Sequence, residues 1–317
     1  MLKTAIVFPG QGSQYVGMGK DLYDNVELAP IKSGLARQLF DQADEIIGSQ
    51  LSKICFEGPE DELRQTKNTQ PAIFLHSVIL LKLLGHNFDA VCTAGHSLGE
   101  YSALVFAESL NFEDALRLVC LRGELMQKAG DEQKGTLAAV VGLGPEVVKE
   151  ICKEASSAGI VQCANFNSPG QIVISGSVPG VHKAMEIAKT KGAKMVKELV
   201  VSGAFHSPLM QSAQNGLINA LENVMINDAR IPVYTNVTAK PITKSEEIRS
   251  SLEKQVTSAV LWEDSIRNMI NDGVNSFIEI GPGKVLQGLI KRINPDVKTI
   301  GIDRHQDIST LLNSYGK

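Results

Sequence analysis

Ser97 lies between two glycines in the stretch "AVCTAGHSLGEYSALVFAE", residues 90–108. A small-residue, β-prone run ends at Gly95, and a helix-like pattern begins after Gly99. This G-x-S-x-G spacing is typical of a nucleophile elbow, a sharp strand-to-helix turn that exposes the serine oxygen. The following helix would place free N–H groups and a positive dipole end beside that oxygen. A serine that merely caps a helix gives a similar local pattern, so other residues must decide between the two.

A serine hydroxyl is a poor nucleophile without a base, and His206 in "VVSGAFHSPLM" fits that role best. It follows a predicted strand, and Ser207 and Pro208 resemble the cap and first residue of a helix. A helix N-terminus favours the neutral imidazole that a base requires. The other histidines are expected to be structural or exposed: His76 in the core or lining a cavity, His96 shaping the turn, His182 on a helix, and His86 and His305 at the surface.

Arg122 occupies the apolar stripe of the helix predicted in "NFEDALRLVCLRGELMQ", whereas Arg117 lies off that stripe. A buried cation costs several kcal/mol unless it is paired. An internal salt bridge or a substrate anion could supply the partner, and the residues alone do not choose between them. A guanidinium suits a carboxylate, because two parallel hydrogen bonds can form.

The glycine-rich loop "FPGQGSQYVGMGK" fits neither common nucleotide-binding motif. The G-x-G-x-x-G pattern would need glycine at Tyr15, and a Walker A sequence starting at Gly12 would need lysine at Met18. The loop could instead bring backbone N–H groups close to a reacting carbonyl. An oxyanion hole needs one donor besides the residue after the serine, Leu98, and Gln11 is the candidate.

The elements that must position these residues alternate between strand and helix, which predicts a parallel α/β sheet. Strands are expected at 4–8, 89–95, 232–238 and 275–283, with a buried helix over 71–84 ended by Gly85. A second helix is expected from 112, with Asn111 as N-cap and Gly130 just past its end. Between about 131 and 199 the order becomes βαββαβ, the ferredoxin-like arrangement. We therefore predict an inserted small domain at 131–199 within a large domain formed by 1–130 and 200–317.

The composition is that of an ordinary globular protein, with 317 residues, 43% hydrophobic and 21% charged. A net charge of −4 lacks the overall positive charge that is typical of nucleic-acid-binding proteins. The five cysteines form no C-x-x-C pair, which argues against a disulfide framework and against a thiolate zinc site. The longest apolar stretch, "AIFLHSVILLKLLG", is too short and too polar to span a bilayer. We expect a cytoplasmic protein without a metal or cofactor.

Taken together, these motifs resemble the malonyl-CoA:acyl carrier protein transacylase family. The resemblance runs in order over nearly the whole chain, through "FPGQGSQ", "TQPAIF", "GHSLGEYSAL", "LRGELMQ", "NFNSPGQIVISG", "GAFHSPLM" and "EIGPGKVLQGLIKRI". It implies an α/β-hydrolase-like large domain with the ferredoxin-like insert. It also implies malonyl transfer from malonyl-CoA to the phosphopantetheine thiol of acyl carrier protein, through a malonyl-serine intermediate.

The same resemblance implies a role for each site residue. Ser97 would be the acylated nucleophile, His206 its partner, and Arg122 the ligand of the malonyl carboxylate. Gln255 would orient the histidine through a carbonyl oxygen, in place of a triad aspartate. The backbone N–H groups of Gln11 and Leu98 would form the oxyanion hole, and Phe205 would leave little room for the branch of a methylmalonyl group.

Other functions compete with this interpretation. A serine thioesterase would share the serine and histidine, and a discrete acyltransferase could serve a polyketide synthase or a malonate-decarboxylating complex instead of fatty acid biosynthesis. A catalytically silent carrier-binding module is disfavoured by the intact serine, histidine and arginine. We expect a monomer that meets an acidic carrier protein through basic residues, with these candidates: Lys189, Lys191, Lys194, Lys284, Lys291 and Arg292.

Overall fold

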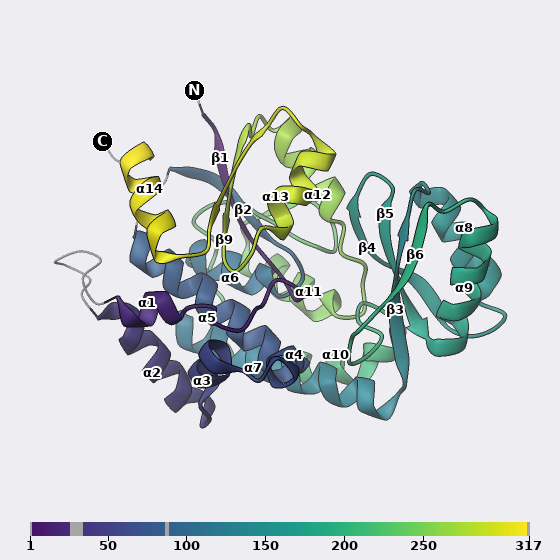
Figure 1. Cartoon of the computed structure of the whole chain (residues 1–317), viewed down its shortest axis with the longest axis horizontal. Coiled ribbons are helices and arrows are strands. Elements are labelled where there is room, and N and C mark those ends of the chain that lie inside the picture. Colours follow the sequence, from purple (N-terminus) through teal and green to yellow (C-terminus); the bar gives the residue numbers. More distant parts are fainter. Residues whose placement is uncertain (1, 26–33, 86–88, 316–317) are drawn as a thin grey trace.

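The computed structural model describes residues 2–25, 34–85 and 89–315, with the side chains of 312–315 left out of the description. His86, expected at the surface, lies outside the described residues. The first sheet has six strands in the order β10-β9-β1-β2-β7-β8 (Figure 1). All neighbouring strands are parallel except the short pair β7–β8. These strands are β1 Thr4–Phe8, β2 Ala90–Gly95, β7 Val233–Tyr234, β8 Pro241–Ile242, β9 Ser276–Ile280 and β10 Lys298–Ile302.

Helices cover both faces of this sheet. Strand β1 is buried throughout, and its side chains alternate between two apolar clusters. Ile6 and Phe8 pack with helices α5 (Thr66–Leu84), α6 (Gly99–Phe106) and α7 (Phe112–Glu132). On the opposite face Ala5 and Val7 pack with α12 (Trp262–Asn271) and α13 (Val285–Ile293). A strand buried on both faces reads as a continuous apolar run, as "TAIVF" does.

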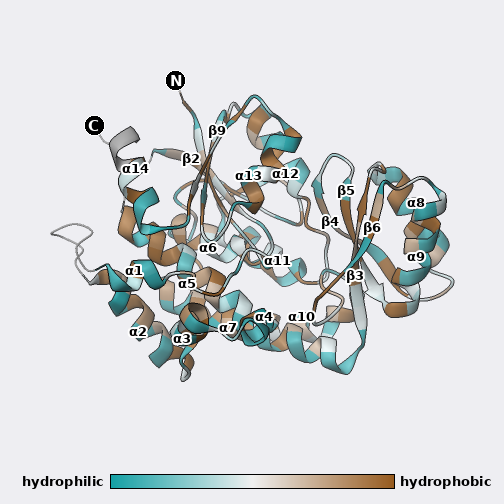
Figure 2. Ribbon diagram, in the orientation of Figure 1, coloured by the Kyte–Doolittle hydropathy of each residue, from teal (hydrophilic) through white to brown (hydrophobic). Residues whose placement is uncertain are grey.

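The second sheet has four strands in the order β4-β5-β3-β6, and every pairing is antiparallel. Its elements follow one another as β3 Gly135–Val141, α8 Pro145–Ala155, β4 Val161–Ser168, β5 Gln171–Ser177, α9 Val178–Thr190 and β6 Met195–Leu199. The βαββαβ order expected from the sequence is therefore present. Helices α8 and α9 share an apolar cluster with one face of the sheet, which the hydropathy colouring shows as brown inner surfaces (Figure 2).

The opposite face of the second sheet packs against α7, α10 (Gln211–Glu222) and the segment around Phe205. Leu137 and Val173 share a cluster with Met126 of α7, Phe205 and Leu217. Leu217 belongs to α10. The remaining helices are α1 Lys20–Asp24, α2 Leu35–Ile47, α3 Leu51–Glu57, α4 Glu60–Arg64, η1 Pro208–Met210, α10 Gln211–Glu222, α11 Ser245–Gln255 and α14 His305–Tyr315. Within the described residues, none of the helices combines the length and apolar character needed to cross a membrane.

The structure corrects three sequence-based boundaries. Helix α5 begins at Thr66, so Pro71 lies inside it rather than at its start. Helix α7 continues to Glu132, so Gly130 does not follow its end. A Cβ at Gly130 would lie 2.0 Å from the backbone oxygen of Ser202, which shows that this glycine permits a close backbone approach. The strand expected over 232–238 is reduced to Val233–Tyr234.

Candidate active site

Ser97 stands at the turn between β2 and α6, with a backbone φ of 51°. This left-handed conformation is strained for a residue with a side chain, and it is the backbone expected of a nucleophile elbow. The flanking glycines explain the motif. A Cβ at Gly95 would lie 1.8 Å from the backbone carbon of Gly99, and a Cβ at Gly99 would lie 2.2 Å from the backbone oxygen of Phe8. No larger residue fits at either position.

Asn236, which follows β7, holds the elbow from the neighbouring strand. Its Oδ1 accepts a hydrogen bond from the backbone N–H of Ser97 at 2.6 Å, and its Nδ2 donates to the backbone oxygen of Gly95 at 2.6 Å. The side chain thus satisfies one backbone group on each side of His96. The ring of His96 points away from this contact, with its Nε2 2.9 Å from Oδ1 of Asn167. The backbone of His96 supports the turn, as expected, since its oxygen accepts from the N–H of Gly99 at 2.9 Å.

His206 reaches the serine from the loop before η1. Its Nε2 lies 2.9 Å from Ser97 Oγ, and its Nδ1 lies 3.0 Å from the backbone oxygens of both Gln255 and Ser258. A carbonyl oxygen can only accept, so Nδ1 carries the proton and Nε2 is free to accept one from the serine. Burial and the positive charge of Arg122 lower the pKa of His206 to about 3. The imidazole is therefore neutral at pH 7.

Arg122 projects from α7 into the same place and is 0% exposed. Its guanidinium donates to three neutral oxygens: Gln70 Oε1 at 2.6 Å from Nη1, and Ser97 Oγ and Gln255 Oε1 at 3.0 Å from Nη2. The ring of Tyr101 lies 5.8 Å from its Cζ. Arg117 on the same helix is exposed, as the stripe predicted.

The guanidinium of Arg122 lacks an ionic partner. Within the described residues no carboxylate oxygen lies within 4.0 Å of it, and its Nε makes no hydrogen bond. Burial lowers the pKa of Arg122, which is the expected consequence of a cation held away from water. An internal salt bridge, one of the two sequence-based possibilities, is therefore not what holds this arginine.

A cavity of about 180 Å³ opens onto these groups. Its walls come from strands of the second sheet, from helices α5 and α7 and from the loops after β1 and β2, and they include Gln11, Leu98, Asn165, Asn167, Val173 and Phe205. The backbone N–H groups of Gln11 and Leu98 donate to no other group within the described part of the chain. Two free amide donors beside a serine oxygen can stabilise an oxyanion. No cluster of metal-ligating side chains was found among the described residues.

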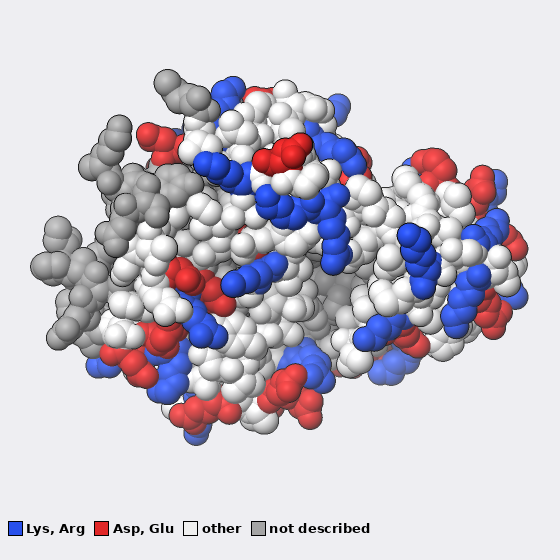
Figure 3. Space-filling model, turned by 45° about the horizontal axis from the view of Figure 1, so that its top comes forward, with Lys and Arg blue, Asp and Glu red and all other residues white. Residues whose placement is uncertain are grey.

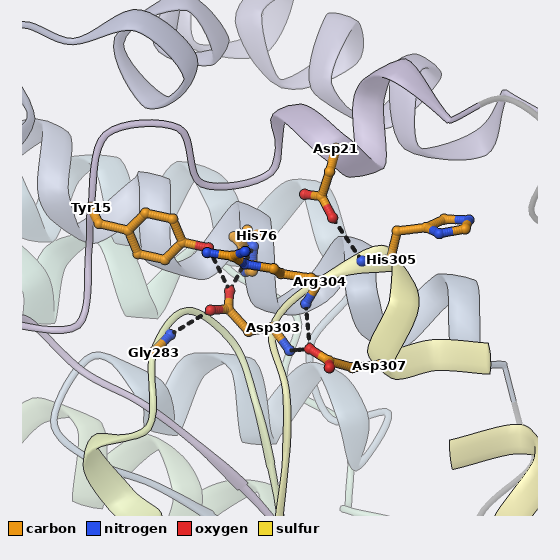
Figure 4. Close-up of polar contacts among 8 residues, drawn as sticks. All are labelled: Tyr15, Asp21, His76, Gly283, Asp303, Arg304, His305 and Asp307. Atoms are coloured by element: carbon orange, nitrogen blue, oxygen red, sulfur yellow. Dashed lines mark hydrogen bonds and ion pairs between the residues drawn. The ribbon is translucent and has the colours of Figure 1, made fainter. Parts of the chain in front are cut away.

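His76, His182 and His305 do not line this cavity. His76 is buried between the loop after β1 and the start of α14, with Nε2 3.5 Å from Asp303 Oδ1 (Figure 4). His76 is thus in the core, as expected, but within the described residues neither ring nitrogen makes a hydrogen bond. Tyr15 donates to the same carboxylate oxygen at 2.9 Å. His182 lies on α9, and His305 begins α14.

The sequence alone did not single out three residues that hold this site together: Gln70, Glu100 and Asn236. Gln70 and Glu100 belong to the quoted motifs "TQPAIF" and "GHSLGEYSAL", and both are buried polar residues on apolar helices. That combination was the available signal. Asn236 gave none, because an asparagine after a short strand is typical of any turn.

Comparison with known proteins agrees with this geometry. The family described as "Acyl transferase domain" matches residues 5–302. The malonyl CoA-acyl carrier protein transacylase of Bacillus subtilis (strain 168) is 45% identical over 316 residues, covering 99% of this chain and 98% of that protein. The chain belongs to the malonyl-CoA:acyl carrier protein transacylase family.

Solved structures of this transacylase family share the fold. The acyl-carrier-protein-S-malonyltransferase of Bartonella henselae superposes with a TM-score of 0.93 at 40% identity, and the match covers 100% of both chains. A malonyl-transacylase in complex with a type II polyketide acyl-carrier protein gives 0.92 at 38% identity, covering 98% of this chain and 99% of that one. The mixed α/β architecture with a largely parallel and an antiparallel sheet is thus that of solved transacylases.

Proposed function

We propose that this transacylase moves the malonyl group from malonyl-CoA to the phosphopantetheine thiol of acyl carrier protein, for fatty acid biosynthesis. The observation that carries the proposal is the buried guanidinium of Arg122, which has no carboxylate partner in the described part of the chain and touches Ser97 Oγ. An acyl group bound to the serine would extend past that guanidinium. A malonyl group ends in the carboxylate that the guanidinium lacks.

In the first step His206 Nε2 takes the hydroxyl proton, and Ser97 Oγ attacks the thioester carbonyl of malonyl-CoA. The N–H groups of Gln11 and Leu98 face the resulting oxyanion, with each donor contributing about 3 kcal/mol. The C–S bond then breaks, and the proton on His206 passes to the coenzyme A sulfur. A malonyl-serine ester remains, and free coenzyme A leaves.

In the second step the carrier thiol gives its proton to His206 and attacks the ester carbonyl. The bond between Ser97 Oγ and the acyl carbon breaks, and the serine recovers its proton. The backbone oxygens of Gln255 and Ser258 hold the imidazole orientation through both steps, in place of an aspartate. These residues supply all of the chemistry, so the proposal calls for no metal or cofactor.

Substrate binding would also tune the base. The positive charge of Arg122 is the second largest cause of the low pKa of His206, after burial. A malonyl carboxylate on Arg122 would neutralise that charge and raise the pKa of the imidazole toward the range in which a general base works best. Substrate recognition and proton transfer would then depend on one guanidinium.

We also infer the finer fold assignments from the topology. The first sheet and its helices form an α/β-hydrolase-like large domain, and residues 131–199 form a ferredoxin-like insert. Phe205, a wall of the cavity, would exclude the branch of a methylmalonyl group. We propose a cytoplasmic monomer whose partners are malonyl-CoA and acyl carrier protein.

A polyketide synthase is the alternative destination for the malonyl group. One structural neighbour is a malonyl-transacylase in complex with a type II polyketide carrier protein, so the fold serves that partner as well. A serine thioesterase is less consistent with the site, because an acyl-specific buried arginine is not needed for hydrolysis.

Replacing Arg122 tests the proposal. Arg122→Ala removes one partner of a buried charge pair, which costs about 3–5 kcal/mol. We expect kcat/KM for malonyl-CoA to fall by orders of magnitude while that for acetyl-CoA, which has no carboxylate, changes little. Arg117→Ala, an exposed change on the same helix, is the control and should alter neither. Equal losses for both thioesters together with a lower Tm would instead make Arg122 a core residue.

A further inference from the structure

We propose that Glu100 is a positioning residue for this reaction, which joins the nucleophile elbow to the carboxylate-binding arginine through one carboxylate oxygen. The inference rests on the proposed function, because it assigns the positioning of the same serine and arginine. Glu100 lies in the first turn of α6, three residues after Ser97, and is 1% exposed.

The first connection leads to the elbow. Oε2 of Glu100 accepts a hydrogen bond from the backbone N–H of Asn236 at 3.0 Å. The side chain of Asn236 in turn holds Ser97 N and the backbone oxygen of Gly95, both at 2.6 Å. Glu100 therefore fixes the residue that keeps the serine in its strained conformation.

The second connection leads to the arginine. The same Oε2 accepts from Gln255 Nε2 at 2.9 Å. That amide also donates to the backbone oxygen of Ser97 at 3.0 Å, and its Oε1 accepts from Arg122 Nη2 at 3.0 Å. Because Nε2 is held by two acceptors, the amide cannot turn its nitrogen toward the guanidinium. Glu100 thus sets which end of Gln255 faces Arg122.

The position of Glu100 is costly for the fold, which argues against a merely structural role. Burial raises the pKa of its carboxyl to about 7, so folding disfavours the ionised form. Glu279 provides a comparison within the same chain, since it is also 1% exposed and its pKa is also raised to about 7 by burial. Its carboxylate, however, accepts from the backbone of Leu286 and Gln287 at the start of α13. Glu279 caps a helix, whereas the hydrogen bonds of Glu100 within the described residues run to Asn236 and Gln255, which hold the serine and the arginine.

The two connections predict separable kinetic effects. Acetyl-CoA reports on the elbow alone, because it presents no carboxylate to Arg122. Malonyl-CoA reports on the elbow and the arginine together. Without Glu100 we expect acylation by both thioesters to slow, by up to about 100-fold for malonyl-CoA, the size expected of a small misplacement of reacting groups. The loss for acetyl-CoA should be smaller, so the preference for malonyl falls.

The test compares Glu100→Ala and Glu100→Gln with Glu279→Gln as the matched buried-carboxylate control. Single-turnover acylation by each thioester is measured beside Tm. Glu100→Gln keeps an oxygen that can accept both hydrogen bonds, so it should recover most of the rate and of the malonyl preference lost in Glu100→Ala. Glu279→Gln should lower Tm without changing the malonyl-to-acetyl ratio.

Two results would overturn the proposal: wild-type acylation rates in Glu100→Ala, or a Glu100→Gln rate no higher than that of Glu100→Ala. If Glu100→Ala does not fold, Asn236→Ala replaces it, because this change breaks the connection between Glu100 and the elbow. Wild-type acylation rates with both thioesters in Asn236→Ala would then overturn the proposal. Labelling of Ser97 by a fluorophosphonate separates this failure from failure of the proposed function. If the wild type reacts with neither thioester, the proposed function fails, and slower labelling in Glu100→Ala than in Glu279→Gln still supports the positioning role.

Discussion

Ser97 and His206 lie 109 positions apart in the chain, yet their Oγ and Nε2 atoms are 2.9 Å apart. Both have a positive φ, 51° and 58°, so each side chain is presented from a strained backbone. Strain of this kind persists only where the surrounding contacts hold it, and for Ser97 those contacts come from Asn236. The reactive geometry is therefore already assembled without substrate.

Replacing His206 removes the proposed base. His206→Ala should slow acylation by malonyl-CoA by about 10²–10⁴-fold, the usual contribution of general-base catalysis. Single-turnover acylation at neutral pH measures this directly. His182→Ala, on the exposed side of α9, is the control and should leave the rate unchanged. Undiminished acylation in His206→Ala would assign that histidine a structural role.

The sequence predicted which of these residues meet but not how they are held. The glycine spacing indicated the elbow, because only glycine avoids the clashes at Gly95 and Gly99. The apolar stripe indicated that Arg122 is buried, but only the structure shows that its partners are neutral oxygens. Contacts between residues far apart in the chain leave no local pattern, which is why Asn236 was not found.

Helix α5 carries a second buried histidine, outside the candidate site. Burial lowers the pKa of His76 to about 3, and the charged groups around it are Asp303 and Arg304 with the hydroxyl of Tyr15 (Figure 4). Asp303 itself is fixed by the backbone N–H of Gly283 at 3.1 Å. This cluster joins the loop after β1 to the segment between β10 and α14.

His76 should make the fold sensitive to acid. Its folded pKa lies below the unfolded value, so the unfolded chain binds a proton that the folded protein does not, and stability falls as pH drops below about 6.5. The penalty from this group at pH 5 is about 2 kcal/mol. The free energy of unfolding, measured from pH 7 to pH 5, should therefore depend less on pH in His76→Leu than in the wild type. An unchanged dependence, with His182→Leu as control, would contradict the assignment.

Element boundaries were predictable where local chemistry sets them. Asn111 caps α7 as expected, with its Oδ1 accepting from the backbone N–H of Asp114 at 2.9 Å. The end of α7 was not predictable in this way, because Gly130 is required by the close approach of the Ser202 backbone and does not end its own helix. The length of β7 likewise depends on pairing with β2 and β8.

The second sheet contacts the segments that carry the site through its strand β4. Strand β4 of the second sheet is linked to Val260, which precedes α12, by two backbone hydrogen bonds. The N–H of Phe166 donates to the oxygen of Val260 at 2.9 Å, and the N–H of Val260 donates to the oxygen of Ala164 at 2.8 Å. Gln162 on the same strand donates to the backbone oxygen of His206 at 2.8 Å. The second sheet therefore helps to hold the histidine. The βαββαβ order of its elements was predictable because strands and helices differ in the spacing of their apolar residues.

Basic side chains surround the hollow between the two sheets (Figure 3). Of the candidate docking residues, Lys291 is engaged elsewhere, because its Nζ donates to the backbone oxygens of Pro295 and Val297 at 2.9 and 2.7 Å. Lys284 is exposed at the start of α13. Arg292 is exposed near its end and donates only to the neutral side-chain oxygen Oε1 of Gln171 among the described residues, so its charge has no ionic partner there. These two are the better test of docking.

Reversing both charges, Lys284→Glu with Arg292→Glu, should raise KM for an acidic carrier protein several-fold and lower its dependence on salt. KM for malonyl-CoA should change less. Lys240→Glu is the control. Lys240 is exposed and directly precedes β8, the edge strand of the first sheet opposite β10. Equal changes for both substrates, or no change for either, would show that Lys284 and Arg292 do not dock the carrier protein.

The mass of the intact protein reports whether malonyl transfer passes through Ser97. After mixing with malonyl-CoA the wild type should gain the mass of one malonyl group, carried on Ser97, and lose it promptly when phosphopantetheinylated carrier protein is added. Ser97→Ala should fold with an unchanged Tm and gain nothing. An adduct that forms equally on Ser97→Ala, or one that the wild type loses to water as fast as to carrier protein, would contradict malonyl transfer through this serine.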